Sequence, residues 1–82
     1  MVESDRDRAI RLARELYEAK KREGMDFDSG PCLSEEVMPD WCVDIAHEPA
    51  DNLPQNQCRS YRTGRVHHFV ELDPEGNLIR AK

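Results

Sequence analysis

The alternating run of residues 66–72 constrains the fold of this chain more than any other segment. Valine, histidine, phenylalanine and leucine occur there together with one glutamate, and a turn-forming sequence follows directly. In an extended chain, successive side chains point to opposite faces of a sheet. The run therefore predicts a strand with one core face and one more polar face. The core face holds Val66, His68, Val70 and Leu72, and the opposite face holds His67, Phe69 and Glu71.

An amphipathic helix is predicted near the N-terminus, because apolar residues recur there at helical spacing. Ser4 followed by Asp7 resembles a capping box, with aspartate in place of the usual glutamate. The pair Asp7–Arg11 places an acid four residues before a base, which is the favourable order. The apolar stripe consists of Ala9, Ile10, Leu12, Ala13, Leu16, Tyr17 and Ala19.

Other strands are predicted on both sides of that run. Trp41–Ala46 alternates cleanly and indicates a half-buried strand, and residues 58–62 favour a short strand. Residues 73–77 read Asp-Pro-Glu-Gly-Asn, which is a strong turn sequence, and residues 78–80 then return as a last strand. We therefore expect an α+β fold. One N-terminal amphipathic helix packs on one face of a small three- to four-stranded antiparallel sheet, whose strand order the sequence leaves open.

The remaining segments are interpreted as connections. Residues 25–40 form a long connection with at most one helical turn, opened by Ser34, Glu35 and Glu36 and stopped by Pro39. Residues 47–57 are polar and contain two prolines, which is typical of a loop.

Length and composition indicate one domain over residues 1–82 with a thin core. Hydrophobic residues make up 38% of the 82 positions and charged residues 35%, and chains of this size bury only a modest share of their surface. The first five residues lack the basic and apolar regions of a signal peptide, and no long apolar run is present. We therefore expect a cytoplasmic protein without a membrane segment.

Charge argues against general binding of nucleic acid. The formal net charge is -5, whereas nucleic-acid binding requires a basic surface. The exception is local: Arg59, Arg62 and Arg65 surround Tyr61 and offer a weaker alternative, in which they bind RNA phosphates while the ring stacks on a base.

Three cysteines are expected to be reduced thiols in a cytoplasmic protein. A zinc-stabilised domain is the main alternative function, with Cys32, Cys42, His47 and Cys58 as the ligands. The spacing of these four residues lacks the C-x2-C knuckle that makes such a pattern specific. Without zinc, the cysteines act as small hydrophobic residues, and we expect no cofactor.

The leading hypothesis is a binding module that acts through an open sheet face. One helix covers only one face of the sheet, so the other is left for self-association or a protein partner, and a homodimer is one such outcome. We assign no catalytic residue, although a cysteine, a histidine and an aspartate on this face leave a thiol enzyme as a lesser alternative. The expected binding residues are Cys42, Asp44, His67, Phe69 and Glu71.

Overall fold

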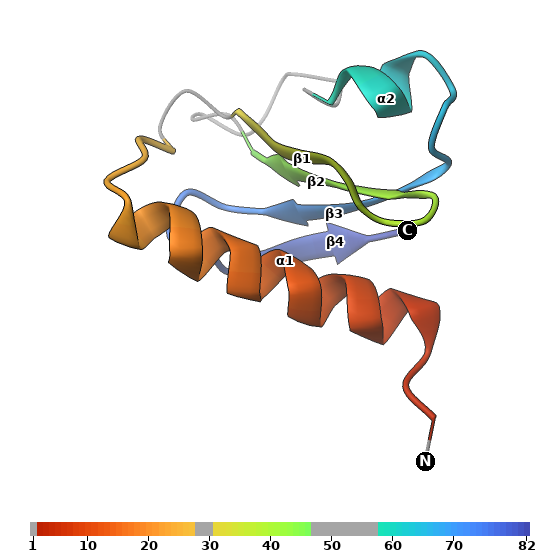
Figure 1. Cartoon of the computed structure of the whole chain (residues 1–82), viewed down its shortest axis with the longest axis horizontal. Helices are drawn as coiled ribbons and strands as arrows, with labels where there is room; N and C mark the ends of the chain where they lie inside the picture. The colour runs from red at the N-terminus through yellow and green to blue at the C-terminus, as the bar shows by residue number, and fades with distance from the viewer. Residues whose placement is uncertain (1, 28–30, 47–57) are drawn as a thin grey trace.

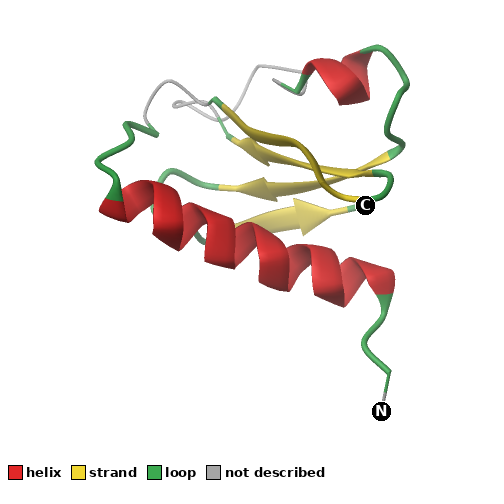
Figure 2. Ribbon diagram, in the orientation of Figure 1, coloured by secondary structure: helices red, strands yellow, loops and turns green. Residues whose placement is uncertain are grey.

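The computed structural model describes residues 2–27, 31–46 and 58–82, which form a four-stranded sheet between two helices (Figure 1). Helix α1 spans Asp5–Arg22 and α2 spans Arg59–Arg62. The strands are β1 (Cys32–Met38), β2 (Trp41–Ile45), β3 (His68–Leu72) and β4 (Leu78–Ala81). Figure 2 shows the long α1 along one face of the sheet and the short α2 on the other. The predicted α+β class, with an N-terminal helix packed on a small sheet, is confirmed.

Helix α1 begins where the sequence predicts. The Ser4 hydroxyl accepts a hydrogen bond from the Asp7 N–H over 3.1 Å, which satisfies one of the free amides at the helix start. The buried positions of α1 are Ala9, Ala13 and Tyr17, so the small alanines let the helix lie close to the sheet. The Tyr17 hydroxyl donates to the Pro74 carbonyl oxygen over 2.7 Å, which ties the helix to the turn before β4.

The strand order is β1-β2-β3-β4, and one of the three pairings is parallel. Strands β1 and β2 pair antiparallel, as do β3 and β4, whereas β2 and β3 run parallel. The expectation of a wholly antiparallel sheet is therefore wrong in this detail. Parallel neighbours need a long crossover connection, and the chain between Ile45 and His68 is long enough to provide it.

Two further predictions about local structure are wrong. Strand β1 lies within the expected connection 25–40, and no helical turn forms at Ser34–Glu36. The pairing of β1 with β2 shifts register twice, so β1 lacks the simple alternation by which a strand is recognised. The segment 58–62 is not a strand, because Arg59–Arg62 form α2 with Cys58 as its N-cap. The expected loop 47–57 lies outside the described residues.

The buried side chains form two separate clusters. The larger one lies between α1 and the sheet and contains Ala9, Ala13, Tyr17, Phe27, Leu33, Trp41, Val43, Ile45, Val70 and Leu72. The smaller one contains Cys42, Cys58 and Val66, with Cys32, Tyr61 and Phe69 packed against it. Val66 was expected on the same face as Val70, but β3 begins only at His68, so Val66 is free to turn to the opposite side.

Candidate functional site

The sheet face away from α1, here called the second face, carries four of the five predicted binding residues. In the parallel register Cys42 pairs with Phe69, and Asp44 pairs with Glu71. Residues that pair in register point to the same face of the sheet. The alternation in the sequence therefore predicted correctly that these four side chains share one face. The expectation that this face is open is wrong along β2, because Cys42 is fully buried and Asp44 is only 3% exposed.

Helix α2 lies over the second face and helps to bury Cys42 and Asp44. It is attached to β1 in two ways. The Glu35 carboxylate accepts the backbone N–H of Ser60 over 2.7 Å and that of Arg59 over 3.4 Å. The Ser60 hydroxyl donates to the Glu35 carbonyl oxygen over 2.6 Å. The backbone N–H groups that donate to the carboxylate, that of Ser60 first, lower the pKa of Glu35 because they favour its ionised form. A disulfide between Cys32 and Cys58 is the second attachment.

An aromatic pair and an ion pair lie at the part of the second face that is still exposed. Tyr61 and Phe69 meet edge to face, with ring centroids 5.0 Å apart, and both are half-buried. Arg80 Nε lies 2.8 Å from Glu71 Oε1. Lys82 exchanges backbone hydrogen bonds with Phe69, which places its side chain on the same face. This group of Tyr61, Phe69, Glu71, Arg80 and Lys82 is called the β3–β4 patch below.

His67, the fifth predicted residue, lies outside the strand and bonds to Asp40. Asp40 Oδ1 accepts the backbone N–H of His67 over 2.9 Å and lies 2.8 Å from its ring Nδ1. His67 is the main cause of the lowered pKa of Asp40. Asp40 has a φ of +71°, a left-handed conformation that aspartate adopts more readily than most residues. Asp40 was not among the predicted binding residues, although Pro-Asp before a predicted strand is a recognisable turn signal.

Trp41 and His68 complete this end of the sheet. Their rings stack with centroids 4.7 Å apart, and His68 Nε2 lies 3.6 Å from Asp40 Oδ2. Asp40 therefore joins the turn between β1 and β2 to the start of β3. The role of Asp40 is structural. It holds His67 outside β3, whereas Cys42 and Asp44 lie within β2 on the second face.

The cysteines differ from the expected set of reduced thiols, since Cys32 is bonded to Cys58 and only Cys42 is free. Burial, and next the nearby charge of Asp44, raise the pKa of Cys42 to about 12. Its thiol is thus protonated at neutral pH, which argues against a thiolate nucleophile on this face. Within the described residues no group of three or more ligand side chains is arranged to hold a metal ion. His47 lies outside those residues.

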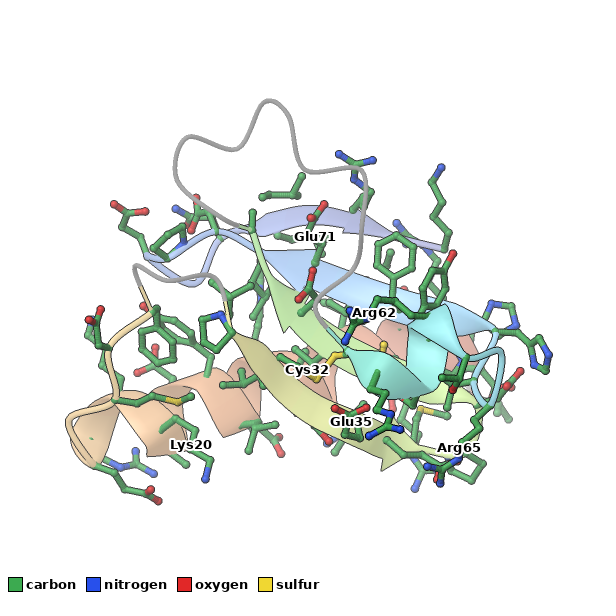
Figure 3. All side chains as sticks on the ribbon, turned by 90° about the horizontal axis from the view of Figure 1, so that it is seen from above. Lys20, Cys32, Glu35, Arg62, Arg65 and Glu71 are labelled. Carbon is green, nitrogen blue, oxygen red and sulfur yellow. A yellow bond between two sulfur atoms is a disulfide. The ribbon has the colours of Figure 1, made fainter. Side chains whose placement is uncertain are left out.

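Arg59, Arg62 and Arg65 are exposed. Arg62 is the last residue of α2, and Figure 3 shows Arg65 well apart from it. Arg62 also lies close enough to Glu35 to help lower the pKa of that carboxyl. A phosphate bound by Arg62 would therefore compete with a carboxylate that already caps α2.

No helix in the described part of the chain is long and apolar enough to cross a membrane. Comparison of the chain with protein-family models, with curated proteins and with solved structures found no match.

Proposed function

We propose that this chain is a small binding module that uses the β3–β4 patch, with a second copy of the same chain as the first partner to test. The supporting observation is the half-buried pair Tyr61–Phe69 beside the Glu71–Arg80 ion pair. Aromatic residues with part of their surface exposed are common anchors of protein interfaces, and charged residues around them set the register.

Charge supports a second copy as the partner. The patch holds an acid and a base that already pair within one chain, at 2.8 Å. Across a two-fold axis the same patch of both copies meets, and where one residue contacts a second residue of the partner copy, the reverse contact also forms. Glu71 of each copy is therefore able to face Arg80 of the other. A patch with both signs of charge is suited to that exchange.

Sedimentation velocity over a range of concentrations tests this proposal. The wild-type chain is expected to dimerise, and Arg80→Glu to weaken the dimer because it places two like charges side by side. The swap Glu71→Arg/Arg80→Glu restores the pairing and is expected to restore the dimer. Arg14→Glu, on the outer side of α1, is the matched control. A wild-type chain that stays monomeric at millimolar concentration excludes the second copy and leaves another protein as the partner.

Phe69→Ala tests the aromatic half of the patch. The larger cluster does not contain Phe69, so we expect the variant to fold, with a loss of about 1–2 kcal/mol from its contact with Tyr61. Association is expected to fall more than folding stability does. Circular dichroism and sedimentation on the same sample separate the two effects.

A zinc-stabilised domain remains the second candidate function, because all three cysteines meet in the smaller cluster. Zinc needs Cys32 and Cys58 as thiolates, so a zinc form and the disulfide form exclude each other. Metal analysis of protein purified under reducing conditions without chelator is the test. We expect no stoichiometric zinc, and one zinc ion per chain would contradict that expectation.

The cytoplasmic location also stays a proposal. It requires that the disulfide be open for much of the time, because the cytosol keeps thiols reduced. Rapid alkylation of intact cells, followed by counting the blocked cysteines, measures the state. A fully oxidised Cys32–Cys58 pair in growing cells would contradict a cytoplasmic location.

A further inference from the structure

We propose that the Cys32–Cys58 disulfide is a redox-controlled latch that holds α2 on the second face, and that a small thiol reductant of the glutathione type opens it. The inference rests on the proposed function in one respect: Tyr61, which α2 positions, belongs to the β3–β4 patch. Opening the latch therefore alters the surface that is proposed to bind.

The latch joins two elements at their ends. Cys32 is the first residue of β1, and Cys58 is the N-cap of α2. Helix α2 has only four residues, too few to be helical without outside support. In Figure 3, Cys32 and Glu35 both lie beside α2. Once the disulfide is open, the Glu35 hydrogen bonds and the small apolar cluster must hold α2.

The two clusters explain why α2 is able to leave without unfolding the rest. Cys58 and Tyr61 pack only in the smaller cluster, and the larger cluster contains neither of them. Among the elements that α2 touches, β1 is the main one, and β1 has its own extensive pairing with β2. Local opening of such a weakly attached segment is a common form of native-state motion.

The reaction balances with two equivalents of the small thiol. The first thiolate attacks Cys32 Sγ, forms a mixed disulfide and releases Cys58 as a thiolate, which then takes up a proton. Cys32 is the more accessible sulfur, because it is half-buried whereas Cys58 is fully buried. The second thiol displaces Cys32 from the mixed disulfide. Two electrons pass to the protein, and the small thiol leaves as its own disulfide.

Cys42 reports whether the latch is open. Its side chain is fully buried in the same cluster and lies close enough to the Ser60 side chain of α2 for that side chain to act on its pKa. Departure of α2 removes that contact and gives a thiol reagent access to Cys42. The Cys42 thiol does not attack the disulfide itself, because burial keeps it protonated.

The test compares the labelling rate of Cys42 in the oxidised wild type and in Cys32→Ser/Cys58→Ser, in which Cys42 is the only thiol. We expect labelling to become faster by on the order of 100-fold, as the closed loop of 26 residues implies. Trp41 fluorescence is expected to stay native-like, because Trp41 belongs to the larger cluster. Cys42→Ala is the control for labelling at other sites.

Two results overturn the latch. An unchanged labelling rate means that α2 stays in place without the disulfide. Loss of the native Trp41 signal means that both clusters unfold together. Wild type reduced by the small thiol, then labelled with a short pulse of thiol reagent, checks that such a loss is not caused by the serine substitutions. Sedimentation of the double variant tests the proposed function separately, and weaker association than in wild type is expected. Faster labelling of Cys42, with no dimer of wild type or double variant, supports the latch and excludes the second copy as partner.

Discussion

The two faces of the sheet are covered in different ways. On one face, an 18-residue helix and the sheet enclose ten buried side chains, three of them from the helix. On the other, a four-residue helix packs on three buried residues, two of them cysteines, and is held by a disulfide and a glutamate. The contrast shows that a short chain has enough apolar side chains for one well-packed layer. Its second layer depends on a covalent link and a few polar contacts.

The largest expected effect comes from removing a central side chain of the larger cluster. Leu72→Ala should cost about 2–5 kcal/mol, because Leu72 is fully buried and its loss leaves a cavity. Ile10→Ala is the contrast, since Ile10 only borders that cluster, and about 1 kcal/mol is expected. Urea unfolding measures both. Equal losses would show that the cluster has no tightly packed centre.

Gly76→Ala is the next largest change, and it affects the same layer. Gly76 has a φ of +91°, and an added Cβ would lie 2.5 Å from Tyr17 Cε1. Tyr17 is fixed by its hydrogen bond to Pro74, so we expect about 2–3 kcal/mol. The control is Gly64→Ala, just after α2, where φ is +79° with nothing within 4 Å. There the backbone strain alone should cost about 1 kcal/mol, and a similar loss at both sites would contradict the close packing of Tyr17.

A matched valine pair sharpens the comparison between the layers. Val70 belongs to the larger cluster and Val66 to the smaller, and both are buried. Val70→Ala is expected to lower the free energy of unfolding by about 2 kcal/mol. Val66→Ala should lower the free energy of global unfolding by less than about 1 kcal/mol. Its main effect is expected to be faster amide hydrogen exchange in α2, through local opening. A larger global loss at Val66 would argue that the layers are one unit.

The smallest effect concerns Glu35 and acid. Hydrogen bonds to Ser60 hold the pKa of Glu35 below its ordinary value of 4.5. The contribution of the Glu35 carboxylate to folding stability is therefore complete above pH 4.5. It is lost as the pH falls through the lower pKa of the folded state. At pH 7, Glu35→Gln should cost about 0.5 kcal/mol, the low end for a helix-cap contact, because Glu35 is exposed. Its stability should depend less on pH below 4.5 than that of wild type, with Glu15→Gln as the control.

The sequence predicted the layer that depends on periodicity and missed the one that depends on contacts distant in the chain. Helix α1, β2, the 73–77 turn and β4 follow from local spacing and turn chemistry. Helix α2 did not, because its four residues are helical only through Glu35 and the disulfide, which lie more than twenty residues away. The parallel pairing of β2 with β3 and the bulged β1 are also set by such contacts.

The same division applies to the candidate site. Alternation placed Cys42, Asp44, Phe69 and Glu71 on one face, because side-chain direction in a strand is a local property. Burial is not local, so the cover over Cys42 and Asp44 was missed. The bond between His67 and Asp40 joins residues 27 positions apart and was missed for the same reason.

Residue-resolved hydrogen exchange in Cys32→Ser/Cys58→Ser tests the central claim, that the two layers are stabilised separately. The amides of Ser60 and Val66 report on the α2 layer, through bonds to Glu35 and to the Ser60 carbonyl oxygen. The Ala46 amide, which donates to Leu72 over 2.7 Å, reports on the sheet above α1. Loss of protection at Ser60 and Val66 with Ala46 unchanged is the predicted result. Exchange of all three at one common rate would contradict it.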